Sequence, residues 1–198
     1  MRRNNVLTWI ALGSLAVLVG IELLTHYDTW PRQVALSFTS IIGGGIYLLV
    51  FVKLRRQQIV IPWIAAWLVA LGIWFDAAGN FAGLYGRILW WDKPAHCVSS
   101  MAVTAVFWFI IVRLNQQGRI RLSSWLINLF SVSLTMLISS IYEVTELIGD
   151  SFWPTNRITD LYDSADDLMW NLLGAIFIVL ICQLVKNKKT KTPFDKES

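Results

Sequence analysis

The chain has 198 residues, of which 56% are hydrophobic and only 15% are charged, and its formal net charge is +4. Soluble proteins carry about 25% charged residues, so this composition excludes an ordinary soluble fold. The Lys and Arg residues stand at the ends of hydrophobic runs and form no single stripe, which argues against nucleic acid as a partner.

Six apolar segments are long enough to cross a membrane as helices, which takes about 20 residues with a working range near 17 to 25. The first resembles a signal peptide, but no small-residue cleavage site ends it, so we expect a spanning helix there. In chain order the expected spans are 6–24, 34–52, 59–75, 97–113, 125–147 and 168–185. We therefore predict an all-α integral membrane protein, a single domain built as a bundle of six transmembrane helices, with a basic tail at 186–198.

The distribution of cations predicts the orientation of this bundle. Short cytoplasmic loops are enriched in Lys and Arg. One set of loops and ends carries thirteen of the 17 cations, and the other set carries four, which are Arg32, Arg87, Lys93 and Arg157. We therefore expect both termini to be cytoplasmic.

The acidic residues gather on the opposite side. Asp195 and Glu197 lie in the tail, and the other eleven Asp and Glu residues fall in the outer loops or in the outer turns of helices. Acidic residues contribute little to topology, so their segregation indicates a separate role at the outer face.

The first polar motif is Asp92-Lys93-Pro94-Ala95-His96, which precedes the fourth span. Asp92 and His96 are four residues apart and would share one helix face. A carboxylate fixes the tautomer of an imidazole and leaves its other nitrogen free to bind a metal or to move a proton. The alternative is a helix cap beside an interfacial histidine.

The second motif, Tyr142-Glu143-Val144-Thr145-Glu146, lies near the outer end of the fifth span. At 1.5 Å per residue, Glu143 lies about 9 Å beneath a helix end near Gly149. A charge at the centre of the membrane costs at least about 2.5 to 3.5 kcal/mol, so Glu143 should face the protein interior. The alternative is a hydrogen bond to a neighbouring helix.

The third motif runs from Thr159 to Gly174 and opens the last span. Asp163, Asp167 and Asn171 follow at intervals of four residues and form a row down one helix face. Gly174 would let another helix approach that row closely. Capping of the helix N-terminus is the simpler account of Asp163, Ser164 and Asp166.

Two smaller features accompany these motifs. Asp76 and Asn80, four residues apart, end the third span and precede small residues that form a packing face or a short re-entrant element. Glu22 and His26 have the same spacing, and either they complete an outer polar pocket or they are simply solvated.

At these motifs the sequence resembles the VanZ-like group of bacterial membrane proteins and, more closely, its YjdF-type relatives. The resemblance covers roughly residues 70 to 185 and includes Asp160 in the third motif; the VanZ-like pattern often has Gln in place of Glu146. It implies a multi-spanning protein of the bacterial inner (plasma) membrane, associated in the VanZ-like branch with glycopeptide (teicoplanin) resistance. The positions that carry over are Asp92, His96, Glu143, Asp167 and Asn171.

Together these observations predict an acidic and histidine-containing pocket at the outer leaflet that binds a divalent cation and an amphiphilic envelope ligand. Mg, Mn or Ca suits the carboxylates, and Zn is the alternative. The expected metal ligands are Glu143, Glu146, Asp163, Asp167 and His96. If the protein is a lipid-headgroup hydrolase or transferase, its catalytic residues would be Glu143, His96 and Asp167. Its substrate-binding residues would be Lys93, Arg157, Asn171 and Asp76. The alternatives are a proton- or cation-coupled transporter and a noncatalytic envelope factor. Membrane lipids are the expected partners.

Overall fold

The computed structural model describes residues 2–88, 90–153, 155, 157–158 and 162–190. Every regular element in these ranges is an α-helix: α1 (Arg2–Leu24), α2 (Trp30–Arg56), α3 (Trp63–Phe81), α4 (Leu84–Arg87), α5 (Asp92–Gln116), α6 (Ser124–Phe152) and α7 (Asp163–Thr190). All but the one-turn helix α4 are long and apolar enough to cross a membrane. The predicted all-α fold with six candidate spans is therefore confirmed. Residues 191–198 of the expected tail lie outside the described residues.

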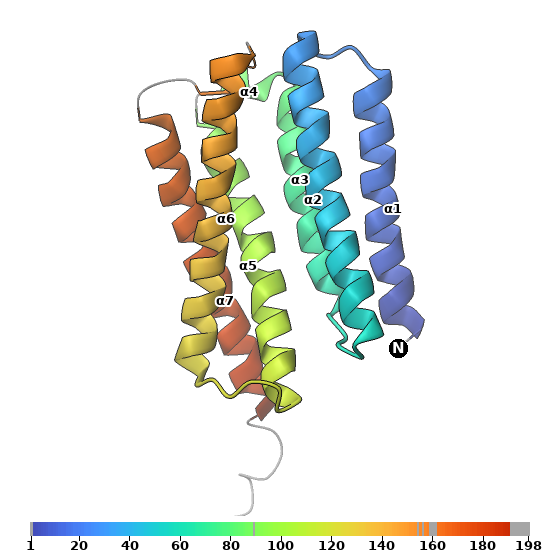
Figure 1. Ribbon diagram of the computed structural model, residues 1–198, viewed down its shortest axis with the longest axis vertical. Helices are drawn as coiled ribbons and strands as arrows, with labels where there is room; N and C mark the ends of the chain where they lie inside the picture. The colour runs from blue at the N-terminus through green and yellow to red at the C-terminus, as the bar shows by residue number, and fades with distance from the viewer. Residues whose placement is uncertain (1, 89, 154, 156, 159–161, 191–198) are drawn as a thin grey trace, which may run out of the picture.

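The long helices run up and down, so their ends gather at two faces of the bundle (Figure 1). The α1–α2 loop, α4, the end of α6 and the start of α7 lie at one face, which we call the acidic end. The start of α1 and the α2–α3 and α5–α6 loops lie at the other, the basic end. The first and last described helical turns are both at the basic end, as an even number of spans requires.

The third span differs from its predicted boundaries of 59–75. α3 begins at Trp63, because Pro62 occupies the cap position and the chain before it is extended. A residue before proline is sterically pushed out of the helical conformation. Ile59 and Ile61 are still buried, which explains why this apolar segment resembles the start of a span.

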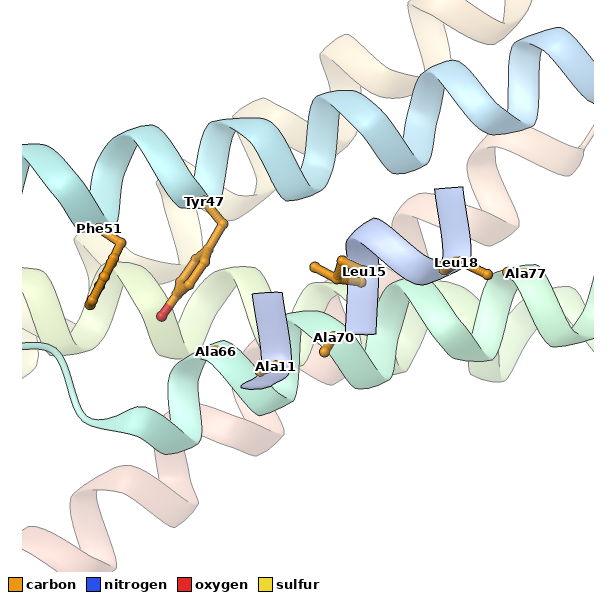
Figure 2. Close-up of a cluster of buried hydrophobic side chains, with 8 residues drawn as sticks. All are labelled: Ala11, Leu15, Leu18, Tyr47, Phe51, Ala66, Ala70 and Ala77. Carbon is orange, nitrogen blue, oxygen red and sulfur yellow. The ribbon is translucent and has the colours of Figure 1, made fainter. Parts of the chain in front are cut away.

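The interior contains two hydrophobic clusters, one in each half of the bundle. The first joins α1, α2 and α3, with Tyr47 and Phe51 of α2 directed toward the alanine-rich face of α3 (Figure 2). The second joins α5, α6 and α7 around Trp108, Ile127 and Val179. Packing between α3 and α5 connects the halves.

Glycines allow close packing on both sides of α5 just below His96. A Cβ on Gly174 of α7 would collide with the carbonyl of Cys97 and the hydroxyl of Ser100. On the α3 side, a Cβ on Gly72 would lie 3.2 Å from the Cα of Ser99. The predicted close approach at Gly174 is therefore confirmed, and α7 is held against α5.

We expect Gly174→Ala to lower the free energy of unfolding by about 1 to 3 kcal/mol, because the added methyl meets a backbone carbonyl that has no room to move. The matched control is Gly20→Ala in α1, where nothing lies within 4 Å of the new Cβ. Alanine has the higher helix propensity, so this control should keep or raise stability. Denaturation of both variants in detergent tests the difference, and equal effects would contradict the packing account.

Candidate functional site

The acidic end brings together side chains from α5, α6 and α7 around the imidazole of His96. Its Nε2 lies 3.4 Å from Oδ1 of Asp92 and 3.5 Å from Oδ2 of Asp167. Its Nδ1 lies 3.2 Å from Nδ2 of Asn171 and 4.0 Å from Oε1 of Glu143. The three predicted motifs therefore meet at one histidine.

Glu143 is the least satisfied member of this group. Its side chain comes from α6 and is only 5% exposed. Among the described residues, neither of its carboxylate oxygens makes a well-directed hydrogen bond, and its polar neighbours are the hydroxyl of Ser164 and the imidazole of His96, 4.0 Å away. Burying an unpaired carboxylate is strongly unfavourable, so this position requires a proton or a cation that balances the charge.

Two overlapping sets of side chains have the composition and spacing of metal ligands. Within each set, one ligand atom per residue can be chosen so that all lie within 4.8 Å of one another. Asp167, which is 3% exposed, belongs to both sets and so lies at the centre of the acidic cluster. One set is Asp92, His96 and Asp167, and the other is Glu143, Glu146 and Asp167.

Arg157 supplies the positive charge beside this cluster. Its Nη2 lies 2.5 Å from Oε1 of Glu146 and also donates a hydrogen bond to the phenol oxygen of Tyr142. Burial alone would lower the pKa of Arg157, but Tyr142 and then Glu146 raise it above its ordinary value. The guanidinium therefore stays charged and neutralises Glu146.

Asp150 positions the loop that carries Arg157. Its carboxylate accepts a hydrogen bond from the hydroxyl of Thr155. It also accepts bonds from the backbone N–H groups of Arg157 at 2.9 Å and Ile158 at 2.8 Å. These bonds fix the backbone of the loop, so that the Arg157 side chain reaches across to Thr39 of α2, whose Oγ1 is 3.4 Å away.

Comparison with known proteins identifies the family. A family model described as "Predicted membrane protein (DUF2238)" matches residues 6–188, which cover the six spans, apart from Asn5 at the start of the first, and every residue of the cluster. The chain belongs to this family. A protein of Thermotoga maritima, described as an uncharacterized protein, is 26% identical over 154 residues, covering 74% of this chain and 73% of that protein. No solved structure matches the chain.

This DUF2238 protein places the expected site residues in two groups. His96, Glu143, Glu146, Asp167 and Asn171 meet in the cluster, and Arg157 joins it by pairing with Glu146. Asp163, Lys93 and Asp76 lie elsewhere at the acidic end: Asp163 is half-buried one turn before Asp167, Lys93 pairs with Asp166 at 2.9 Å, and Asp76 accepts a hydrogen bond from Tyr85. Asp160 lies outside the described residues.

Our reading of the motifs missed a polar row along α6. Ser131, Thr135 and Ser139 are buried and precede Glu143 at intervals of four residues, so the row extends about 18 Å from the cluster toward the basic end. Thr104 of α5 donates a 2.8 Å hydrogen bond to Thr135 in this row. The four-residue spacing of Ser and Thr residues in an apolar span is the sequence signal that indicates this polar row.

Proposed function

We propose that this membrane protein binds a divalent cation at its acidic end, held by His96, Glu143 and Asp167 with Asp92 beside them. The observation that carries the proposal is the buried carboxylate of Glu143, whose two oxygens make no well-directed hydrogen bond in the described part of the chain and have only Ser164 and His96 as polar neighbours. A cation in contact with these oxygens would supply the interaction that the surrounding protein does not.

The charge balance supports a divalent ion. Asp92, Glu143 and Asp167 surround one imidazole, whereas the nearest guanidinium, that of Arg157, is already engaged by Glu146. Two positive charges would therefore offset an excess of carboxylates in a region of low dielectric. A mixed set of one nitrogen and several oxygens favours Mn or Zn, while Mg and Ca prefer oxygen alone.

The position of the cluster supports an envelope lipid as the ligand. It lies at the ends of three apolar helices, where a lipid headgroup resides when its tails are in the membrane. A bound cation would polarise a phosphoryl or carbonyl oxygen, and a neighbouring carboxylate would accept a proton, which together describe a lipid-headgroup hydrolase or transferase. The likeness to VanZ-like and YjdF-type proteins favours a bacterial inner membrane and a role in glycopeptide resistance by analogy alone.

A second candidate function is proton- or cation-coupled transport, which the polar row of α6 favours. The buried hydroxyls of Ser131, Thr135 and Ser139 lead from Glu143 into the half of the membrane facing the basic end. Relays of this kind need polar groups beyond the initial carboxylate. In that case Thr135→Val should abolish cation flux in proteoliposomes while the cluster still binds its ion.

Cation titration of the purified, chelator-treated protein tests the proposal. Mn²⁺, Zn²⁺, Mg²⁺ and Ca²⁺ are added separately, and both metal content and thermal stability in detergent are measured. We expect one or more of them to bind saturably and to raise the melting temperature, because a ligand that binds only the folded state stabilises it. If none binds and none stabilises, the cluster holds protons and the metal site is wrong.

A further inference from the structure

A second group of unpaired polar atoms lies in the other half of the bundle. Four buried side-chain oxygens there make no well-directed hydrogen bond among the described residues: Oε2 of Glu22, the hydroxyl of Tyr27, Oε1 of Gln33 and Oγ of Ser37. The hydroxyls of Tyr27 and Ser37 lie within reach of each other, and the two acceptor oxygens of Glu22 and Gln33 are left without a donor. Buried polar groups are nearly always paired, so these oxygens indicate something that the protein atoms alone do not provide.

Neighbouring contacts bring one face of α2 against Glu22 of α1. Gln33, Ser37 and Ser40 stand at i, i+4 and i+7 of α2 and therefore share one helix face. Ser40 at one end of this face donates a 2.9 Å hydrogen bond to Oε1 of Glu22. Gln33 at the other end donates from Nε2 to the carbonyl oxygen of Glu22, also at 2.9 Å. Ser37 lies between two residues that both contact Glu22.

Tyr27 completes the group from the loop between α1 and α2. Its ring packs against Phe81 of α3 with centroids 4.5 Å apart, which holds the loop over the ends of the helices. Burial, and after it the charge of Glu22, raises the pKa of Tyr27 to about 12. The phenol therefore keeps its proton and contributes a neutral oxygen, which lies beside the hydroxyl of Ser37.

The four atoms differ from the His96 cluster in both chemistry and charge. All are oxygens, and Glu22, which is 2% exposed, is the one carboxylic acid among them. Asp76, a further acid whose charge acts on Glu22, accepts a hydrogen bond from the hydroxyl of Tyr85 and lies near the charge of Arg157. A proton on Glu22 would serve one acceptor, whereas a cation bound between α1 and α2 would interact with several of these oxygens at once.

We propose that Glu22, Tyr27, Gln33 and Ser37 bind a monovalent cation, Na⁺, between α1 and α2 at the acidic end. Hard cations of this size bind through oxygen, and one positive charge balances the one carboxylate. The site lies in the half of the bundle that does not contain His96. The proposal therefore does not depend on the divalent site. Its bound ion would tie the α1–α2 loop to both helices.

The test measures thermal stability of the full-length protein in detergent with a chelator present, so that no divalent ion contributes. Solutions of NaCl, KCl and choline chloride are compared at equal ionic strength, and ²²Na⁺ binding is measured in parallel. We expect saturable ²²Na⁺ binding and a higher melting temperature in Na⁺ than in choline. Equal melting temperatures in Na⁺ and choline, or stabilisation by K⁺ alone, would overturn the proposal.

Two variants locate the ion. Ser37→Ala should weaken Na⁺ binding by roughly tenfold, because one ligand to a charge is lost. The matched control is Ser14→Ala, because the hydroxyl of Ser14 donates a hydrogen bond to the carbonyl of Ala11 within α1. It should leave the affinity unchanged.

Glu22→Gln removes the charge that requires the ion, so this variant should lose the response to Na⁺ and match or exceed the stability of the wild type in choline. The stability measured in choline distinguishes loss of the ion site from misfolding of the protein. If Glu22→Gln kept the wild-type response to Na⁺, the ion would bind elsewhere and the assignment would be wrong.

Discussion

Replacing Glu143 with glutamine should weaken binding of the divalent cation by at least about 100-fold, since even residues that only orient a metal ligand contribute 10- to 100-fold. The same change should stabilise the metal-free protein, because a neutral amide is cheaper to bury without a partner than a carboxylate is. Loss of affinity together with a gain in metal-free stability is a signature that general damage to the fold would not produce.

Metal titration by calorimetry and denaturation of the chelated protein measure the two effects separately. Asp28→Asn is the matched control, because Asp28 is an exposed carboxylate at the same end, 3.1 Å from Arg32 in a surface ion pair. It should bind the cation as the wild type does. Wild-type affinity in Glu143→Gln and in Asp167→Asn alike would show that the cluster is not the metal site.

Arg157→Gln should lower the free energy of unfolding by about 3 to 5 kcal/mol, which is the usual cost of removing one partner from a buried ion pair. Both partners are nearly inaccessible, with side-chain exposures of 13% for Arg157 and 6% for Glu146. The loss leaves Glu146 beside the other carboxylates with nothing to neutralise it, and it also removes the bridge from the α6–α7 loop to Thr39.

A second substitution distinguishes this electrostatic cause from a packing defect. Glu146→Gln in the Arg157→Gln background should recover most of the lost stability, because it removes the uncompensated charge. Lys93→Gln serves as the control, since its pair with Asp166 is largely solvated and is worth at most about 1 kcal/mol. No recovery in the double variant would mean that Arg157 acts through shape and not through charge.

Hydropathy and helical spacing predicted most of the architecture. The six spans follow from apolar length, and the inward direction of Glu143 follows from the cost of a charge facing lipid. The approach of His96 to Asp92 was predictable because both lie on one helix face, and its approach to Asp167 because the motifs occur at the same end of the bundle.

Contacts that depend on loops or on the choice of neighbouring helix were not predictable. Residues 153–162 have no periodicity, so nothing in their sequence indicated that Arg157 would pair with Glu146. Glu22 was expected beside His26, but His26 is exposed and Glu22 turns toward Ser40 of α2. Spacing along one helix defines a shared face, but only packing decides which helix meets that face.

The glycines on either side of α5 also limit how this family can vary. Gly72 and Gly174 press on the same turn, around Cys97, Ser99 and Ser100, directly below the histidine of the cluster. A larger side chain at either glycine would displace His96 relative to Glu143 and Asp167. Relatives that retain the cluster should therefore keep small residues at these positions, and an enlargement on one helix should be accompanied by a reduction on the helix it faces.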